Sequence, residues 1–183
     1  MEFKAKKSLG QNFLIDKNII KKIIAHSKIT KYDTVLEVGP GTGNLTKEII
    51  NQKPKKIILI EKDNGLVKEL LLKYKNKVQI LHNDILKIDE TNLSRDQILV
   101  FGNLPYNIST RILTKWIINL KKKIWFKKMF LMFQKEVADR IIAKSKTTDY
   151  GRLSIISQWK MNIKKIMDIK PNAFFPKPKI IST

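Results

Sequence analysis

The sequence predicts an α/β fold with a doubly wound, mostly parallel sheet. Short apolar runs alternate with amphipathic stretches along most of the chain, and a glycine-rich turn follows the first of these runs. Alternating strands and helices form β-α-β units, whose strands lie parallel in one sheet. The length of 183 residues suits a single compact domain, since domains commonly contain roughly 100–200 residues.

The amino-terminal half is expected to contain three helices and three strands. Isoleucines recur at helical spacing from Ile19 to Ile24, with lysines between them, which predicts an amphipathic helix over residues 19–29. Apolar runs bounded by turn-forming residues predict strands, and a return to helical spacing predicts the helices that follow them. In chain order these are a strand at 34–38, a helix at 45–50, a strand at 56–60, a helix at 64–74 and a strand at 78–81.

The carboxyl-terminal half continues the alternation. The pattern predicts a strand at 97–101, a helix at 108–120, a strand at 129–133 and a helix at 135–143. Residues 153–158 and 163–169 are expected to close the sheet as an antiparallel pair, with Pro171 ending the second strand.

The charge of the chain favours a polyanionic partner. The formal net charge is +21 at pH 7 and the sequence pI is about 10.1, which is typical of proteins that bind nucleic acid. The alternative is a solvated basic surface, because nearly all of this charge comes from lysine and arginine occurs only at positions 95, 111, 140 and 152. Charge alone does not separate RNA, DNA and anionic lipid.

The chain has no cysteine, which excludes disulfides and thiolate metal sites. The two histidines, His26 and His82, form no ligand cluster in the sequence, so we expect no metal site. No stretch approaches the roughly 18 apolar residues of a membrane span, and no apolar segment follows the basic amino terminus. We therefore expect a soluble, cytoplasmic protein.

A glycine-rich turn marks the first place to look for a ligand site, because ligands bind beyond the carboxyl ends of the strands in open α/β sheets. The turn reads Glu37-Val38-Gly39-Pro40-Gly41-Thr42-Gly43 and lies between a predicted strand and a predicted helix. It departs from the dinucleotide pattern G-x-G-x-x-G, because Gly43 comes one residue early and Asn44 holds the final place. This departure argues against an ordinary dehydrogenase.

Acidic residues follow the next two predicted strands. Glu61 lies twenty residues after Gly41, where a carboxylate can accept hydrogen bonds from both hydroxyls of a ribose. Asp84 follows the third strand and can accept from the amino group of an adenine. Each carboxylate alone is better explained as a helix N-cap or a surface residue. Together with the glycine loop they indicate S-adenosylmethionine, and the arrangement resembles the Rossmann-like class I methyltransferase fold.

The fourth predicted strand is followed by Asn103-Leu104-Pro105-Tyr106-Asn107, which as structure alone is a turn before a helix. Tyr106 offers an aromatic platform for an unstacked nucleobase. The Asn103 side chain and the Leu104 backbone carbonyl offer acceptors for the hydrogens of an adenine amino group. Such acceptors favour a pyramidal nitrogen whose lone pair points at a methyl donor, which needs no metal and no covalent nucleophile.

Several segments in the right order resemble the ribosomal RNA adenine dimethyltransferases that act on the small-subunit RNA. The similar segments are Lys7-Ser8-Leu9-Gly10-Gln11-Asn12-Phe13-Leu14, Asn103-Leu104-Pro105-Tyr106-Asn107-Ile108-Ser109, Gln134-Lys135-Glu136-Val137-Ala138-Asp139-Arg140, Tyr150-Gly151-Arg152-Leu153-Ser154 and Phe174-Phe175-Pro176-Lys177-Pro178-Lys179. They span essentially the whole chain.

The resemblance implies roles for individual residues. Asn12, Leu14, Gly39, Gly41, Glu61, Asp84 and Asn103 would bind the cofactor S-adenosylmethionine, and Asn103, Leu104, Pro105, Tyr106 and Phe174 would form the catalytic site. Phe174 would be a second stacking surface for the target adenine; without the resemblance we would place it in the core. Residues 1–30 would form a cofactor lid and a helix, and residues 31–183 the catalytic domain.

The resemblance also implies a substrate and partners. Two methyl groups would be placed on each of two neighbouring adenines of small-subunit ribosomal RNA, in the pre-30S subunit, by a monomeric enzyme. Family members continue past the Phe174–Lys179 segment into a small helical lobe, whereas this chain stops at Thr183.

Four alternatives remain. The chain could methylate large-subunit RNA, but residues 10–12 and 134–140 look more like the small-subunit enzymes. It could belong with the mitochondrial transcription factors that share these motifs, or be a ribosome-assembly factor that binds RNA without catalysis. A DNA adenine methyltransferase is disfavoured by Leu104, where those enzymes usually carry proline.

Overall fold

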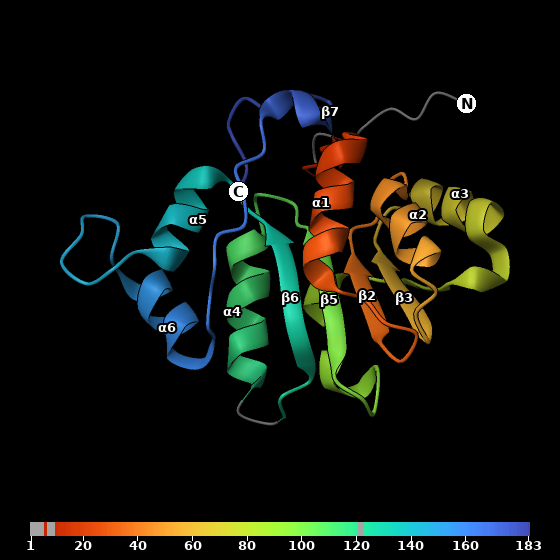
Figure 1. The fold of residues 1–183 in the computed structure, drawn as a ribbon, viewed down its shortest axis with the longest axis horizontal. Coiled ribbons are helices and arrows are strands. Elements are labelled where there is room, and N and C mark those ends of the chain that lie inside the picture. The colour runs from red at the N-terminus through yellow and green to blue at the C-terminus, as the bar shows by residue number, and fades with distance from the viewer. Residues whose placement is uncertain (1–5, 7–9, 121–122) are drawn as a thin grey trace.

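Figure 1 shows the computed structural model, which describes residue 6 and residues 10–120 and 123–183. Five parallel strands form the main sheet, in the spatial order β4-β3-β2-β5-β6. The strands are β2 (Thr34–Val38), β3 (Lys56–Glu61), β4 (Gln79–His82), β5 (Ile98–Asn103) and β6 (Phe126–Met132). From β2 the chain steps outward to β4 and then crosses to the other side of β2, so the strand order reverses between β2 and β5. The predicted doubly wound parallel sheet is confirmed.

Helices cover both faces of the sheet. The α-helices are α1 (Lys17–Ser27), α2 (Asn44–Asn51), α3 (Asn64–Tyr74), α4 (Ser109–Asn119), α5 (Lys135–Ile142) and α6 (Arg152–Lys160). Short 3₁₀ turns lie at η2 (Lys75–Lys77), η3 (Ile85–Lys87), η4 (Glu90–Asn92) and η5 (Pro171–Ala173). Neighbouring strand residues point to opposite faces. Val35 thus packs in the cluster formed with α1, α2 and α3, whereas Leu36 packs in the cluster formed with α4 and α5.

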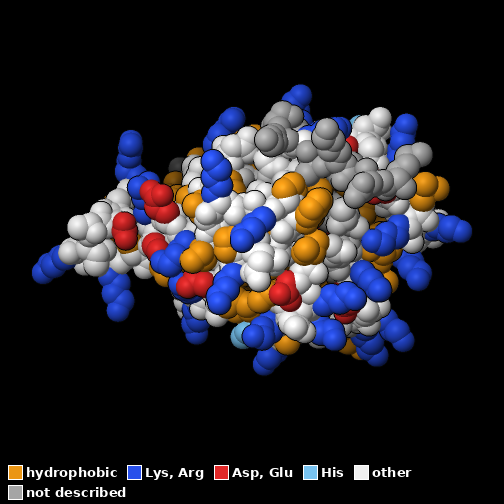
Figure 2. Space-filling model, turned by 90° about the horizontal axis from the view of Figure 1, so that it is seen from above, with side chains coloured by type: hydrophobic (Ala, Val, Ile, Leu, Met, Phe, Trp, Pro, Cys, Tyr) orange, Lys and Arg blue, Asp and Glu red, His pale blue; other side chains and the backbone are white. Residues whose placement is uncertain are grey.

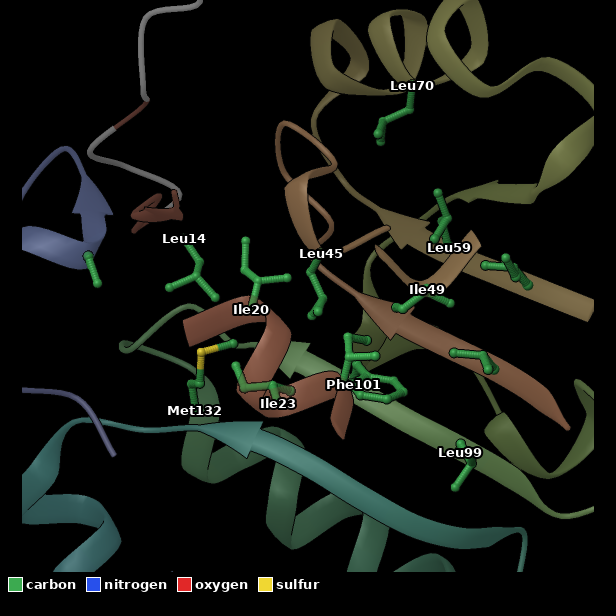
Figure 3. Close-up of a cluster of buried hydrophobic side chains, with 14 of the residues drawn as sticks. Leu14, Ile20, Ile23, Leu45, Ile49, Leu59, Leu70, Leu99, Phe101 and Met132 are labelled. Atoms are coloured by element: carbon green, nitrogen blue, oxygen red, sulfur yellow. The ribbon is translucent and has the colours of Figure 1, made fainter. Parts of the chain in front are cut away.

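Figure 3 shows the first of these clusters, in which α1 contributes Ile20 and Ile23 and α2 contributes Leu45 and Ile49 above strand side chains such as Phe101. The isoleucine spacing that predicts an amphipathic α1 is therefore the spacing of its buried face. Because this face belongs to the same cluster as the strands, α1 fixes the chain that precedes it against the sheet.

Aspartates define where two of these helices begin. The Asp16 carboxylate accepts hydrogen bonds from the backbone N–H groups of Asn18 and Ile19 at 2.8 and 3.1 Å. The Asp63 carboxylate accepts from Gly65 at 2.8 Å and Leu66 at 3.2 Å. Both aspartates satisfy N–H groups that have no partner within the helix.

A two-stranded antiparallel ribbon joins the two terminal regions. Strand β1 (Phe13–Leu14) pairs with β7 (Phe174–Phe175), so that Phe13 lies opposite Phe175 and Leu14 opposite Phe174. Figure 1 places β7 at the end of the molecule toward which β6 points. The sequence did not predict this ribbon, because each strand contains only two residues.

The expectation of an antiparallel pair formed by residues 153–158 and 163–169 is wrong. Residues 153–158 lie in helix α6, whose fully buried Ser154 and Ser157 are three residues apart. Leu153 and Ile156 also pack against the core, as the period of a helix requires. Ile169 does form an antiparallel bridge, but with Ser182, which also bridges to Gln134. The other predicted elements are confirmed, with boundaries that differ by at most three residues.

Candidate functional site

The glycine loop and the Asn103 motif meet at the carboxyl ends of β2 and β5. Val38 lies opposite Gly102 in the parallel ladder, so the following residues, Gly39 and Asn103, emerge side by side. A methyl group added at the Cα of Gly39 would lie 3.6 Å from the Asn103 carbonyl oxygen. This is the point where strand order reverses, which is where open α/β sheets bind their ligands.

The loop after β2 is closed on one side by β1. Gly41 has a φ of +56°, and a Cβ at this position would lie 2.5 Å from Cδ1 of the Phe13 ring. Both the backbone conformation and the contact with Phe13 therefore require glycine. The loop then leads through Gly43 into α2, and the Gly43 carbonyl accepts a 2.6 Å hydrogen bond from the Tyr74 hydroxyl.

Glu61 closes β3 beside this loop and is 7% exposed. Its carboxylate accepts hydrogen bonds from the backbone N–H groups of Lys62 at 2.8 Å, Asp63 at 2.9 Å and Gly41 at 3.3 Å. Burial raises the pKa of Glu61, and these three donors act against that rise. Three of roughly four acceptor positions are thus used by backbone, and the carboxylate is held rigidly against the glycine loop.

A second buried acid, Glu37, lies on β2 two residues before Gly39 and was not singled out from the sequence. Complete burial raises its pKa to about 7, although the Thr46 hydroxyl donates a 2.6 Å hydrogen bond to it and lowers the value. The charge of Glu61 adds to the rise. The signal available in the sequence was an acidic residue within an otherwise apolar strand.

Asp84 follows β4, and its carboxylate acts as the N-cap of η3. It accepts a 2.9 Å hydrogen bond from the Leu86 N–H and forms a 2.9 Å ion pair with Lys62. Burial acts to raise its pKa, but the Leu86 hydrogen bond and Lys62 hold the pKa below its usual value. The capping role considered for this residue alone is therefore present, and contact with an adenine stays a prediction.

Residues 10–12, which precede β1, lie beside the Asn103 motif. The Asn103 side-chain amide donates a 2.6 Å hydrogen bond to the Asn12 carbonyl, and the Asn44 amide donates a 2.9 Å bond to the Leu14 carbonyl. Because Asn103 donates through its nitrogen, its side-chain oxygen is the atom left to accept from a ligand. Asn12 and Leu14 thus lie beside Asn103 and Asn44, whereas Lys7, Ser8 and Leu9 of the same motif lie outside the described residues.

The Tyr106 ring is half-buried, and its hydroxyl lies 2.5 Å from the Ser182 hydroxyl. Burial raises the pKa of Tyr106, and the hydrogen bond with Ser182 acts in the opposite direction. Leu104 is 1% exposed, so its side chain is part of the core, and the Pro105 carbonyl accepts a 3.1 Å bond from Ile108 that closes the turn. The sequence did not point to Ser182, because it lies 76 residues from Tyr106.

Phe174 is 2% exposed and packs in the core cluster that contains Leu14. In this conformation its ring has no face open to a base, so the second stacking surface stays a prediction that requires β7 to move. The neighbouring Phe175 is 58% exposed. The position expected for Phe174 from the sequence alone, in the core, is the one observed.

A buried ion pair supports the turns after β4. The Glu90 carboxylate is fully buried and accepts hydrogen bonds from Lys115 at 2.6 Å and from the Trp116 indole at 2.7 Å. Lys115 also donates to the carbonyls of Ile85 and Ile88. Helix α4 therefore holds the segment that carries Asp84, which sequence reasoning did not identify.

Among the described residues, no group of three or more histidine or acidic side chains is placed to hold a metal ion. Within the same part of the chain, no helix is both long and apolar enough to cross a membrane.

Comparison with known proteins agrees with this geometry. Residues 2–183 match the family model described as ribosomal RNA adenine dimethylase. The chain is 55% identical to the ribosomal RNA small subunit methyltransferase A of Pelagibacter ubique, over all of this chain and 70% of that protein. It is 46% identical to the protein of the same name from Wolbachia pipientis of Culex pipiens, over 98% of this chain and 68% of that protein.

Solved structures give the same result for the fold. A dimethyladenosine transferase from Plasmodium falciparum superposes with a TM-score of 0.81 at 32% identity, over 93% of this chain and 60% of that chain. The 23S rRNA methyltransferase ErmE superposes with a TM-score of 0.77 at 25% identity, over 93% of this chain and 67% of that chain. The fold is therefore the Rossmann-like methyltransferase fold, and the chain spans about 60% of the Plasmodium protein and 70% of the Pelagibacter protein.

Proposed function

We propose that this chain, which belongs to the ribosomal RNA adenine dimethylase family, methylates the N6 amino groups of two neighbouring adenines in small-subunit ribosomal RNA. The methyl donor is S-adenosylmethionine, and the partner is the pre-30S ribosomal subunit. The name of the Pelagibacter relative, at 55% identity, supports the small subunit over the large one. We infer that the protein acts in the cytoplasm as a monomer.

One observation carries this proposal: the glycine loop and the Asn103 motif adjoin at the switch point of the sheet. A Cβ placed on Gly39 would lie 3.6 Å from the Asn103 carbonyl oxygen. A donor bound over the glycines and a base held at Asn103 would share one crevice, as direct transfer between two bound ligands requires.

The residues at the crevice fit S-adenosylmethionine, which supplies an activated methyl group when bound. The space above Gly39 admits a ligand close to the backbone, since this residue carries no side chain and an added Cβ would meet only the Asn103 carbonyl oxygen at 3.6 Å. Glu61 retains acceptor capacity for a ribose hydroxyl, and Asp84 for an amino group. Asn12 and Leu14 would cover the ligand from the β1 side.

The target adenine would be oriented by Asn103, Leu104 and Tyr106, with Pro105 fixing the turn between them. The Asn103 side-chain oxygen and the Leu104 carbonyl would accept hydrogen bonds from the amino hydrogens, so that the nitrogen lone pair is directed toward the methyl donor. Tyr106 would stack on the base, and its hydrogen bond with Ser182 limits the rotation of the ring.

Transfer of labelled methyl groups to small subunits that lack the modification tests the proposal. We expect label in two adjacent adenines with the wild-type protein and none with Asn103→Ala. Binding to these subunits without transfer would favour a non-catalytic assembly factor instead. Large subunits and duplex DNA in the same assay distinguish the other enzyme classes, because label in either would contradict the proposed substrate.

A further inference from the structure

An exposed phenylalanine lies in the β1–β7 ribbon, whose Phe13 contacts the glycine loop. Phe175 is 58% exposed, although the preceding Phe174 is almost completely buried. Adjacent residues of a strand point to opposite sides, so the burial of Phe174 in the core directs Phe175 outward. A single exposed apolar side chain is common on protein surfaces, and its exposure alone assigns no role.

The ribbon places this ring beside the cofactor loop. Phe175 lies directly opposite Phe13 in the antiparallel pair, and side chains of such a pair share one face with Cβ atoms about 5 Å apart. The Phe13 ring in turn abuts the position of a Cβ on Gly41. Ile15, which is 46% exposed, follows β1, and its N–H donates to the Ala173 carbonyl at 2.8 Å.

Lysines predominate around Phe175, although Asp16, whose N–H donates to the Ala173 carbonyl at 3.2 Å, adds an acidic side chain nearby. Residues 169–183 contain three lysines and no acidic residue. Lys170, Lys177 and Lys179 are exposed, and none of them forms an ion pair within the described ranges. Figure 2 looks onto this end of the molecule and shows hydrophobic side chains interspersed with many lysine and arginine side chains and fewer acidic ones. An aromatic ring among unpaired lysines matches the stacking and phosphate contacts that single-stranded nucleic acid offers.

The same segment reaches the catalytic motif. Pro178 is buried, which anchors the chain between the exposed lysines, and four residues later Ser182 contacts the Tyr106 hydroxyl. The segment 174–182 therefore runs from the ribbon beside Gly41 to the expected platform for the target base. A strand of RNA that presents one base to Tyr106 would pass over Phe175 with its neighbouring nucleotides.

We propose that Phe175, Lys177 and Lys179 form a docking surface for the single-stranded RNA that flanks the target adenine, with Phe175 stacking on a flanking base and the lysines binding phosphates. This inference rests on the proposed function and adds to it the residues that hold the substrate outside the reacting site. The basic surroundings favour RNA over an apolar protein partner.

The test measures the dissociation constant of the full chain for a labelled single-stranded RNA with two adjacent adenines, by fluorescence anisotropy at fixed salt. Phe175→Ala is expected to weaken binding roughly 5- to 100-fold, the range for loss of one base–aromatic stack, and Phe175→Trp to retain it. Tyr32→Ala is the matched control, because Tyr32 is 73% exposed and precedes β2, at the opposite end of the strands.

The lysines are tested by salt dependence. Lys177→Ala combined with Lys179→Ala should reduce the slope of log affinity against log salt by about 1.4, since each phosphate contact with a single strand contributes about 0.7. Lys56→Ala combined with Lys77→Ala removes the same charge from exposed positions at the amino ends of β3 and β4. This control should leave the slope unchanged.

Several results would overturn the docking surface. Equal RNA affinity in Phe175→Ala and wild type would contradict the docking surface. A lower cofactor affinity or a lower melting temperature in Phe175→Ala would also contradict it, because Phe175 would then be a cofactor-binding or core residue. A dimer in sedimentation, or binding of anionic vesicles, that Phe175→Ala abolishes would assign the surface to another occupant.

The outcomes also separate this inference from the proposed function. RNA binding that depends on Phe175, without methyl transfer by the wild-type protein, would remove the proposed function and leave the docking surface. Normal methyl transfer, with RNA binding that does not depend on Phe175, would support the proposed function and contradict the docking surface.

Discussion

Tyr106 and Glu61 are expected to serve different ligands. Tyr106→Ala should lower methyl transfer roughly 5- to 100-fold, because base–aromatic stacking contributes about 1–3 kcal/mol, and should leave the dissociation constant for S-adenosylmethionine unchanged in calorimetry. Glu61→Ala should weaken cofactor binding tenfold or more, since hydrogen bonds to charged groups contribute about 1.5–3 kcal/mol. Equal cofactor loss in both variants would contradict the assignment of Tyr106 to the base.

Ser182 is expected to act through Tyr106. Ser182→Ala and Tyr106→Phe each break the hydrogen bond between the two hydroxyls, and each should lower kcat more than it changes KM for the cofactor. If the hydrogen bond causes both effects, the double variant should lose less activity than the sum of the two single variants. The difference, expressed as a coupling energy, should be about 1 kcal/mol. Additive effects would show that Ser182 acts only through the packing of the segment around it, which bridges Gln134 and Ile169.

Glu37 should make the stability of the protein fall as pH rises. Its folded pKa of about 7 lies above the ordinary value of 4.5, so the folded state favours the protonated acid and loses stability between these two pH values. The unfolding free energy of Glu37→Gln, minus that of wild type, should therefore rise by up to roughly 3 kcal/mol when the pH is raised from 4 to 8. Denaturant titrations at both pH values measure this difference, and Glu69→Gln, at an exposed position, is the control. A difference between Glu37→Gln and wild type that is the same at both pH values would contradict a buried charge at Glu37.

Residues that lie close in sequence to a motif could be assigned before the structure was known, and those that depend on folding could not. The closeness of Gly39 and Asn103 follows from two strand ends and the position of a crossover. Ser182 reaches Tyr106 only because residues 181–183 lie between residues 133–135 and Ile169. The burial of Glu37 and Phe174 likewise depends on helices packed above them, which no local pattern specifies.

At the scale of elements, the glycine loop and the β1–β7 ribbon should respond as one unit. Gly41→Ala forces a left-handed backbone onto alanine and places its Cβ against the Phe13 ring, so the ribbon must shift. We expect faster hydrogen exchange at the Ile15 amide, which bonds to Ala173, and at least tenfold weaker cofactor binding. Gly151→Ala is the control, because Gly151 has an extended backbone and no atom lies within 4 Å of an added Cβ. Unchanged exchange at Ile15 in Gly41→Ala would show that the loop and ribbon move independently.

The parallel strands and their helices were predictable because each is long enough to show its period. The error at α6 has a physical origin: Leu153-Ser154-Ile155-Ile156-Ser157-Gln158 is a short apolar run with small polar residues, and such runs do not distinguish a strand from a helix. Contacts with α4 and α5 decide the outcome. The ribbon of β1 and β7 escaped prediction because pairing across 160 residues leaves no local signal.

For the whole molecule, the net charge of +21 should act on the RNA and not on the cofactor. RNA binding releases counterions from phosphates, so affinity should fall steeply with salt; six contacts with a single strand would give a slope near −4 and weaken binding roughly 300-fold for a fourfold rise in salt. The cofactor would meet glycine backbone and the buried Glu61, where salt screens little, so its dissociation constant should change less than threefold over the same range. Anisotropy for the RNA and calorimetry for S-adenosylmethionine, both from 50 to 200 mM salt, measure the two responses. A flat RNA response would mean that the lysines are only a solvated surface, and a steep cofactor response would place the donor outside the crevice between Gly39 and Asn103.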